Sequence, residues 1–140
     1  MLLFISATSG HNLRLCERAK EFADAQGMQT HLICLSSIEL PLFTTERESS
    51  GAPPAVGELE EHFMKASALW ISAPEYNGSI PPTLTNAIAW MSTQTDDFRA
   101  LFNSKPLAIA THSGGGGQKV LVAMRLQFSH LGCNVVGKNY

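Results

Sequence analysis

The sequence predicts an α/β fold in which five parallel strands form a doubly wound sheet of order 2-1-3-4-5. Short apolar runs alternate along the chain with longer segments whose apolar residues recur at helical spacing. Such an alternation favours a parallel sheet, whose strands are joined by right-handed helical crossovers. The expected strands are residues 2–5, 30–35, 68–72, 106–111 and 134–140, and the expected helices are residues 12–26, 56–65, 83–91 and 120–131.

The helices are predicted from their apolar faces and from the residues that bound them. Gly27 follows the first helix, where glycine commonly ends a helix, and the pair Pro53-Pro54 leads into the second. Residues 36–54 are expected to form a long polar loop, and residues 96–103 a linker or a single turn. The side chains expected to face inward are Leu13, Cys16, Ala19, Phe22 and Ala23 in the first helix and Leu59, Phe63 and Met64 in the second.

The composition is that of a globular protein, with 44% hydrophobic and 16% charged residues, and residues 1–140 are taken as a single domain. The net charge is −2, and the acidic and basic residues are scattered along the chain, which argues against nucleic acid as a partner. No apolar run reaches the roughly 18 residues of a membrane span, and the start lacks an export signal. Cys16, Cys34 and Cys133 lack metal-binding or paired spacing, so we expect no metal site and reduced thiols in a cytoplasmic protein.

Polar residues gather in the connections after the first, third and fourth strands, which meet at one edge of such a sheet. The first connection offers hydroxyls, a glycine and the free N–H groups of a helix start, which together suit a phosphate without lysine or arginine. Simple helix capping is the alternative. The connection contains neither a dinucleotide fingerprint nor a P-loop. Its candidate ligand residues are Ser6, Thr8, Ser9, Gly10, His11, Asn12 and Leu13.

The third connection carries the longest motif in the chain. It reads Pro74-Glu75-Tyr76-Asn77-Gly78-Ser79-Ile80-Pro81-Pro82 and leads into a helix that contains Asn86 and Trp90. In this segment, in the hydroxyl-rich first connection and in the glycine run after the fourth strand, the chain resembles the NAD(P)H-dependent FMN reductases. These are flavodoxin-like proteins related to small azoreductases and quinone reductases. The resemblance implies a flavodoxin-like fold, FMN as cofactor, and NADPH or NADH as electron donor.

The resemblance also implies which residues hold the flavin. Backbone groups and the side-chain amide of the third connection would meet the polar edge of the ring, and Tyr76 would flank the ring or the ribityl phosphate. N–H groups of the glycine run would face the pyrimidine end of the ring and favour reduced flavin. The alternative interpretation of the glycine run is a flexible linker. His112 would tune the potential or donate a proton, or is a simple surface histidine. The candidates are Pro74, Glu75, Tyr76, Asn77 and Gly78, and then His112, Ser113, Gly114, Gly115, Gly116 and Gly117.

The implied activity is that of an FMN-dependent oxidoreductase. A reduced nicotinamide would pass hydride to the flavin, which would reduce a quinone, an azo compound, a metal oxyanion or free flavin. No catalytic side chain is required, because the cofactor carries the chemistry. Two other functions stay open. One is an FMN electron carrier without nicotinamide turnover, which a net charge of only −2 disfavours, and the other is a non-catalytic relative.

The sequence departs from the family pattern in two places. The arginine that the family usually carries in the first connection is missing, and the nearest one is Arg14, so the preference between NADPH and NADH stays open. Family members also continue into a further helix, whereas this chain ends at Tyr140. We therefore expect that the final helix is missing or that a partner subunit covers that face, in a homodimer or homotetramer.

Overall fold

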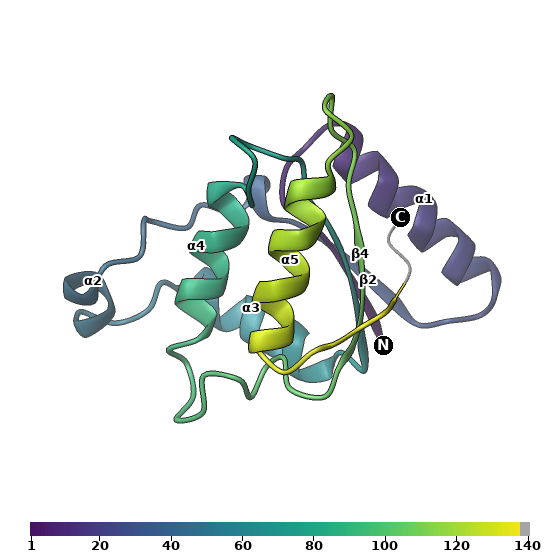
Figure 1. Cartoon of the computed structure of the whole chain (residues 1–140). Coiled ribbons are helices and arrows are strands. Elements are labelled where there is room, and N and C mark those ends of the chain that lie inside the picture. Colours follow the sequence, from purple (N-terminus) through teal and green to yellow (C-terminus); the bar gives the residue numbers. More distant parts are fainter. Residues whose placement is uncertain (138–140) are drawn as a thin grey trace.

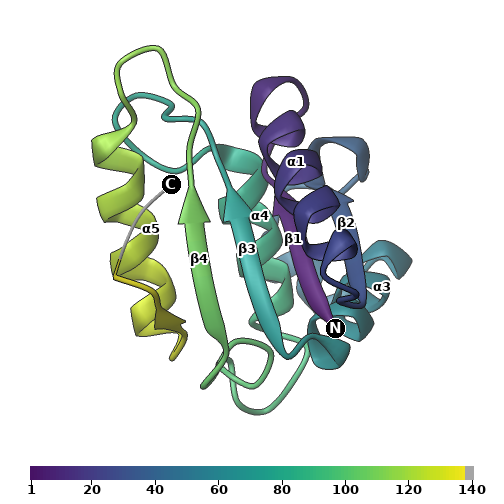
Figure 2. The same ribbon diagram turned by 90° about the vertical axis from the view of Figure 1, so that its right-hand side faces the viewer.

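Five parallel strands form one sheet in the predicted order 2-1-3-4-5, and helices lie on both of its faces (Figures 1 and 2). The protein is seen here as a computed structural model that describes residues 1–137. The strands are β1 (Leu2–Ser6), β2 (Thr30–Cys34), β3 (Ala68–Ser72), β4 (Pro106–Ala110) and β5 (Asn134–Val135). The helices are α1 (His11–Ala25), α2 (Thr45–Ser49), α3 (Pro54–Lys65), α4 (Pro82–Met91) and α5 (Gln118–His130), with a 3-10 turn at η1 (Leu35–Ser37).

The three central strands end level with one another. In the pairing of β1 with β3, Ser6 lies opposite Ser72, and in the pairing of β3 with β4, Ser72 lies opposite Ala110. The connections that follow these strands therefore begin at the same height on the carboxyl edge of the sheet. This register places the three predicted connections side by side before any side-chain contact is considered.

The two faces of the sheet are covered unequally. Figure 1 shows α3, α4 and α5 on one side and α1 on the other. The larger core lies beneath the three helices and includes Ile71, Phe63 and Met124. The smaller core, beneath α1, is built on Phe4, Cys16 and Ala23. Burial raises the pKa of the Cys16 thiol to about 12, so this thiol stays protonated and acts as a core residue.

Two side chains predicted to face inward are exposed instead. Phe22 is 72% exposed and lines an apolar groove with Met28 and Trp70. Met64 is 59% exposed. The buried stripe of α3 runs through Val56, Leu59 and Phe63, and position 64 lies to one side of it.

Two element predictions are also corrected. The expected loop 36–54 contains α2, which forms because the hydroxyl of Thr44 accepts a hydrogen bond from the backbone N–H of Arg47 at 3.2 Å and caps the helix. The last strand, predicted over 134–140, ends at Val135. The guanidinium of Arg125 donates to the carbonyls just there, at 2.8 Å for Val136, so those acceptors are used outside a ladder. Residues 138–140 lie outside the described residues.

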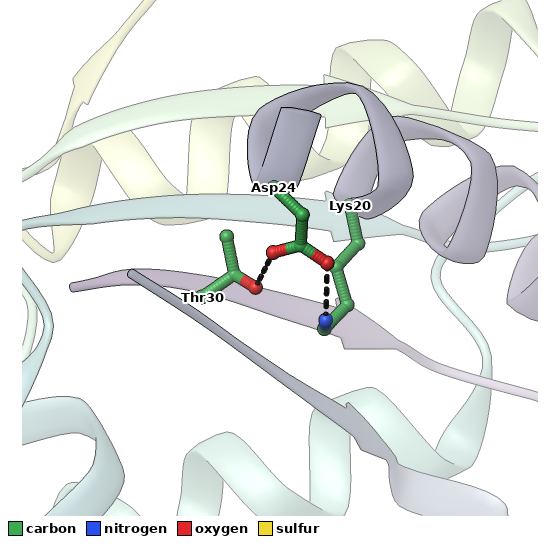
Figure 3. Close-up of polar contacts among 3 residues, drawn as sticks. All are labelled: Lys20, Asp24 and Thr30. Carbon is green, nitrogen blue, oxygen red and sulfur yellow. Dashed lines mark hydrogen bonds and ion pairs between the residues drawn. The ribbon is translucent and has the colours of Figure 1, made fainter. Parts of the chain in front are cut away.

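A polar cluster closes the turn between α1 and β2 (Figure 3). One carboxylate oxygen of Asp24 accepts a hydrogen bond from Lys20 Nζ at 2.7 Å, and the other accepts from the hydroxyl of Thr30. The hydrogen bonds from Lys20 and Thr30 lower the pKa of Asp24. Gly27 follows the helix with a φ of 75°, as the sequence predicted. This cluster lies at the amino end of the sheet, opposite the three connections.

Candidate functional site

The connections after β1, β3 and β4 are tied together by one buried side chain. Asn12 is 3% exposed, and its Oδ1 accepts from the N–H of His112 at 2.9 Å and from the hydroxyl of Ser72 at 2.8 Å. Its Nδ2 donates to the carbonyl of His112 at 3.0 Å. The start of α4 joins the same group, because the Thr83 hydroxyl donates to the carbonyl of Ala7 at 2.6 Å. The predicted convergence of the three connections is confirmed.

A chain of hydroxyls links the connections after β3 and β4. The hydroxyl of Thr111 donates to the carbonyl of Ala73 at 2.6 Å. Because this hydroxyl has one proton, the hydroxyl of Ser113, 2.9 Å away, must donate to it. The Ser113 oxygen in turn accepts from the backbone N–H of Glu75 at 2.7 Å. That N–H of the third connection is therefore used within the protein.

The N-terminus of α1 has no acceptor of its own. The helix has Gly10 as N-cap residue and no side-chain cap. Within the described part of the chain, the backbone N–H groups of residues 8–13 make no hydrogen bond, and the first to do so is that of Arg14, to Gly10 at 3.0 Å. Gly10 has a φ of 81°, a conformation that other residues rarely adopt. A helix end with free N–H groups and the positive end of the dipole suits an anion.

The hydroxyls of the first connection divide into two groups. Ser6 is buried, and its hydroxyl donates to the carbonyl of Thr8 at 2.6 Å. The hydroxyls of Thr8 and Ser9 have no partner among the described residues, and the Ser9 side chain is exposed. Of the predicted donors, Ser6 and the Asn12 side chain are thus engaged inside the protein, whereas the hydroxyls of Thr8 and Ser9 are free of partners among the described residues.

The N-terminus of α5 is occupied by a carboxylate of the protein. Glu75 Oε2 accepts from the backbone N–H groups of Lys119 and Val120 at 3.2 and 3.3 Å. The N-cap residue, Gly117, is left-handed with a φ of 68°, and a Cβ there would clash with the side chain of Thr111. Sequence reasoning assigned the backbone of Glu75 to a ligand and missed this role of its carboxylate.

The glycine run after β4 contains two kinds of glycine. Gly116 and Gly117 have positive φ values of 86° and 68°, which the chain path requires. Gly114 and Gly115 have no such φ, and a Cβ at either would meet nothing within 4 Å. The fold does not explain these two glycines, and their bare backbone is open to the close approach of a ligand.

The third connection forms a tight hairpin at its tip. Tyr76 and Ser79 exchange two backbone hydrogen bonds of 3.0 Å, with Asn77 and Gly78 between them at φ values of 51° and 73°. Two central residues with positive φ define a type I′ turn, for which Asn-Gly is the preferred sequence. The hairpin leaves Tyr76 49% exposed. The Asn-Gly pair was the sequence signal that would have predicted it.

Sequence reasoning missed three residues that build the site. The hydroxyls of Ser72, Thr83 and Thr111 fasten the connections from within, and nothing in their local sequence marks them. The remaining candidates, Leu13 and Pro74, are half-buried beside the site.

A hollow of about 530 Å³ lies along α3, bounded by residues such as Pro54 and Lys65, and it touches none of the three connections. Within residues 1–137, no group of three or more His, Cys, Asp or Glu side chains is placed to hold a metal ion. In the same range no helix has both the length and the apolar character to cross a membrane.

The fold is flavodoxin-like, and the edge where the central strands end carries a helix N-terminus with free N–H groups. The chain belongs to the NADPH-dependent FMN reductase family, whose model matches residues 1–140. The resemblance seen in the sequence is confirmed.

The similar proteins include reductases with different acceptors. An NAD(P)H-dependent FMN reductase of Pseudomonas aeruginosa is 38% identical over 89 residues, which are 64% of this chain and 45% of that protein. A quinone reductase of Escherichia coli is 34% identical over 106 residues, 74% of this chain and 55% of that protein. The chain thus spans about half the length of these curated relatives.

Solved structures support the fold. FerB, a flavoenzyme NAD(P)H:(acceptor) oxidoreductase from Paracoccus denitrificans, is similar with a TM-score of 0.84 and 20% identity, over 99% of this chain and 77% of FerB. An azoreductase from Bacillus anthracis is similar with a TM-score of 0.68 and 13% identity, over 99% of this chain and 83% of that one.

Proposed function

We propose that this protein is an FMN-dependent oxidoreductase that carries electrons from NADPH or NADH to a small-molecule acceptor. The observation that carries the proposal is the row of free N–H groups at residues 8–13, at the edge where three connections meet. The FMN phosphate is an anion of the kind that such a helix start binds. Membership of the FMN reductase family supports the same cofactor.

The residues of the three connections fit FMN. The N–H groups from Thr8 to Leu13 and the hydroxyls of Thr8 and Ser9 would hold the phosphate. The hairpin at Asn77-Gly78 and the open backbone of Gly114-Gly115 would lie against the ring, with Tyr76 at its side. The side chain of Asn12 is used in hydrogen bonds to Ser72 and His112, which we call the Asn12 clamp. Its backbone N–H is therefore the group left for a ligand.

When bound, FMN supplies the hydride-transfer chemistry between a nicotinamide and an acceptor. The chain binds and orients the cofactor, and the Gly114 and Gly115 N–H groups would stabilise negative charge beside them. Glu75 is not assigned as a general acid, because its carboxylate accepts hydrogen bonds from the start of α5. No side chain is assigned as catalytic acid, base or nucleophile.

The first test is a visible absorption spectrum of the purified protein, followed by titration with FMN, FAD and riboflavin. We expect FMN to be bound in preference to FAD, and its absorption to bleach when NADPH or NADH is added without oxygen. A protein that takes up no FMN, by fluorescence quenching or calorimetry, would contradict the proposal.

The acceptor is tested by steady-state consumption of NADPH and NADH with different oxidants. A quinone is the first choice, because several relatives are named as quinone reductases, and an azo dye, a metal oxyanion and free FMN are the other candidates. Consumption that depends on a quinone supports an oxidoreductase. Tight FMN binding without any nicotinamide turnover would instead identify an electron carrier.

We also propose a homodimer or homotetramer, located in the cytoplasm. An apolar groove of about 310 Å³ opens on the α1 face, where Phe22 and Met28 are 72% and 50% exposed, and a second subunit would cover it. The three cysteines are free, which suits a reducing compartment. Sedimentation at micromolar concentration tests the assembly, and a monomer would contradict it.

A further inference from the structure

Two histidines from distant parts of the chain stack beside the free end of α1. The rings of His11 and His112 have centroids 4.3 Å apart and planes inclined by 19°. Both side chains are exposed. His11 is the first residue of α1, and the backbone of His112 is held on both its N–H and its carbonyl by the buried amide of Asn12. The Asn12 clamp therefore holds the backbone that carries His112 next to the first turn of α1, where His11 lies.

The pair supplies the side chains of the anion site that can gain positive charge. The segment 6–13 contains no lysine or arginine, and the next cation along the chain is Arg14, which is exposed on α1. His11 itself contributes one of the free N–H groups. An imidazole changes charge between about pH 5 and about pH 8, so the charge beside this helix end depends on pH.

The other charged groups of these connections are turned elsewhere. The carboxylate of Glu75 accepts from the N–H groups of α5, and the side chain of Lys119 lies over Gly78, where a Cβ would be 3.3 Å from Lys119 Cδ. In the described part of the chain, no ion pair joins either histidine to a carboxylate. A proton gained by the pair is thus not neutralised by an acidic side chain.

We infer that His11 and His112 form a proton-dependent clamp for the phosphate of FMN, so that FMN binds more tightly as the pH falls. The inference rests on the proposed FMN function and adds the regulation of that site. Two stacked imidazolium rings repel each other, and an anion beside them relieves the repulsion. Protons therefore raise the affinity for phosphate, and phosphate raises the affinity for protons. Riboflavin has no phosphate and is not affected.

The test compares FMN and riboflavin affinities by flavin fluorescence at about pH 8 and about pH 6.5, where a phosphate monoester is still mostly a dianion. The variants are His11→Gln, His112→Gln and the double variant, with His130→Gln as matched control, because His130 is exposed at the far end of α5. We expect FMN affinity to rise about threefold to tenfold in the wild type and the control when the pH is lowered from about 8 to about 6.5. The rise should fall below about twofold in the double variant, and riboflavin affinity should not rise.

The outcomes separate the inference from the proposed function. An equal pH effect in the double variant, or a similar rise for riboflavin, overturns the proposed histidine clamp and leaves the proposal of FMN binding intact. Absence of FMN binding by the wild type at both pH values overturns the proposed function, and the clamp with it. A second readout is the NMR titration of the histidine ring protons, in which FMN should raise the titration midpoints of His11 and His112 but not that of His130. Unmoved midpoints would also overturn the clamp.

Discussion

Among the helices that begin at the carboxyl edge of the sheet, α1 and α5 differ in how their N-termini are occupied. At α5, Glu75 places its carboxylate on the N–H groups of Lys119 and Val120 at 3.2 and 3.3 Å. At α1, the N–H groups of residues 8–13 have no acceptor within the described chain, and no side chain caps the helix. The positive end of the α5 dipole is thus compensated by a carboxylate of the protein, whereas that of α1 has no acceptor among the described residues.

The comparison separates geometry from chemistry. Both helices follow a strand of the same sheet, and both have a glycine as N-cap residue, Gly10 for α1 and Gly117 for α5. What distinguishes the two ends is one carboxylate. A side-chain cap contributes roughly 1 kcal/mol to a helix, and α1 has neither such a cap nor the carboxylate that α5 receives.

The largest effect is expected from removal of the Asn12 clamp, which joins the start of α1 to the connection that leads into α5. Asn12→Ala leaves the N–H and the carbonyl of His112 and the buried hydroxyl of Ser72 without their partner. We expect the free energy of unfolding to fall by about 2–4 kcal/mol and FMN affinity to fall by more than about tenfold. Urea titration and fluorescence binding measure the two effects.

The matched control for the clamp is Asn134→Ala. This amide is exposed and donates one hydrogen bond, to the carbonyl of Ser104 at 3.2 Å, at the other end of the sheet. Its loss should change stability by less than about 0.5 kcal/mol. If Asn12→Ala were as mild as this control, the three connections would be held together by something other than the clamp.

A second substitution makes the end of α1 resemble that of α5. Ser9→Asp places a carboxylate beside the free N–H groups, and Ser9→Asn is the neutral control of the same shape. Without flavin, the aspartate should stabilise the protein by about 0.5–1 kcal/mol. It should also weaken FMN binding by about tenfold or more relative to the asparagine, because phosphate and carboxylate repel each other, with little effect on riboflavin. Equal FMN affinities of the two variants would place the phosphate elsewhere.

The reciprocal substitution makes the end of α5 resemble that of α1. Glu75→Gln keeps an oxygen near the N–H groups of Lys119 and Val120 but removes the charge, and we expect the free energy of unfolding to fall by about 0.5–1 kcal/mol. Glu58→Gln is the control, since Glu58 is exposed on α3. Thermal melts measure the difference. A Glu75 variant as stable as the control would mean that the carboxylate contributes nothing to α5.

Local features of the sequence predicted most of the fold. The four long helices and the first four strands lie within two residues of their predicted bounds, because apolar runs, helical periodicity and bounding prolines are local properties. The exposure of Phe22 was not predictable in this way, since it depends on how much of the sheet α1 covers.

The site was predictable as a place but not as a set of contacts. Strand order alone brings the three connections together. The partners within the site are far apart in sequence: Asn12 meets His112, and Glu75 meets Lys119 and Val120. No local pattern specifies which carboxylate fills which helix end. The assignment of individual residues to FMN stays a prediction.

The smallest expected effect is on the pH dependence of stability, and it distinguishes the stacked pair His31–His62 from the stacked pair His11–His112. His31 of β2 and His62 of α3 have ring centroids 4.0 Å apart and planes inclined by 11°. Burial of His31, followed by the charges of His62 and Lys20, lowers the pKa of His31 from its ordinary value of 6.5. The folded state therefore holds fewer protons than the unfolded state in acid. The stabilisation is complete above about pH 6.5 and is lost as the pH falls through the lowered pKa.

His31→Gln removes this titration. Between about pH 7.5 and about pH 5, the variant should lose a few tenths of a kcal/mol less stability than the wild type, a small difference because the ring is partly solvated. Urea titrations at the two pH values measure it, with His130→Gln as control. The pair at α1 should behave in the opposite way when FMN is bound, since a phosphate there favours protonation. Equal acid sensitivity of His31→Gln and the wild type would show that the His31–His62 pair does not couple folding to pH.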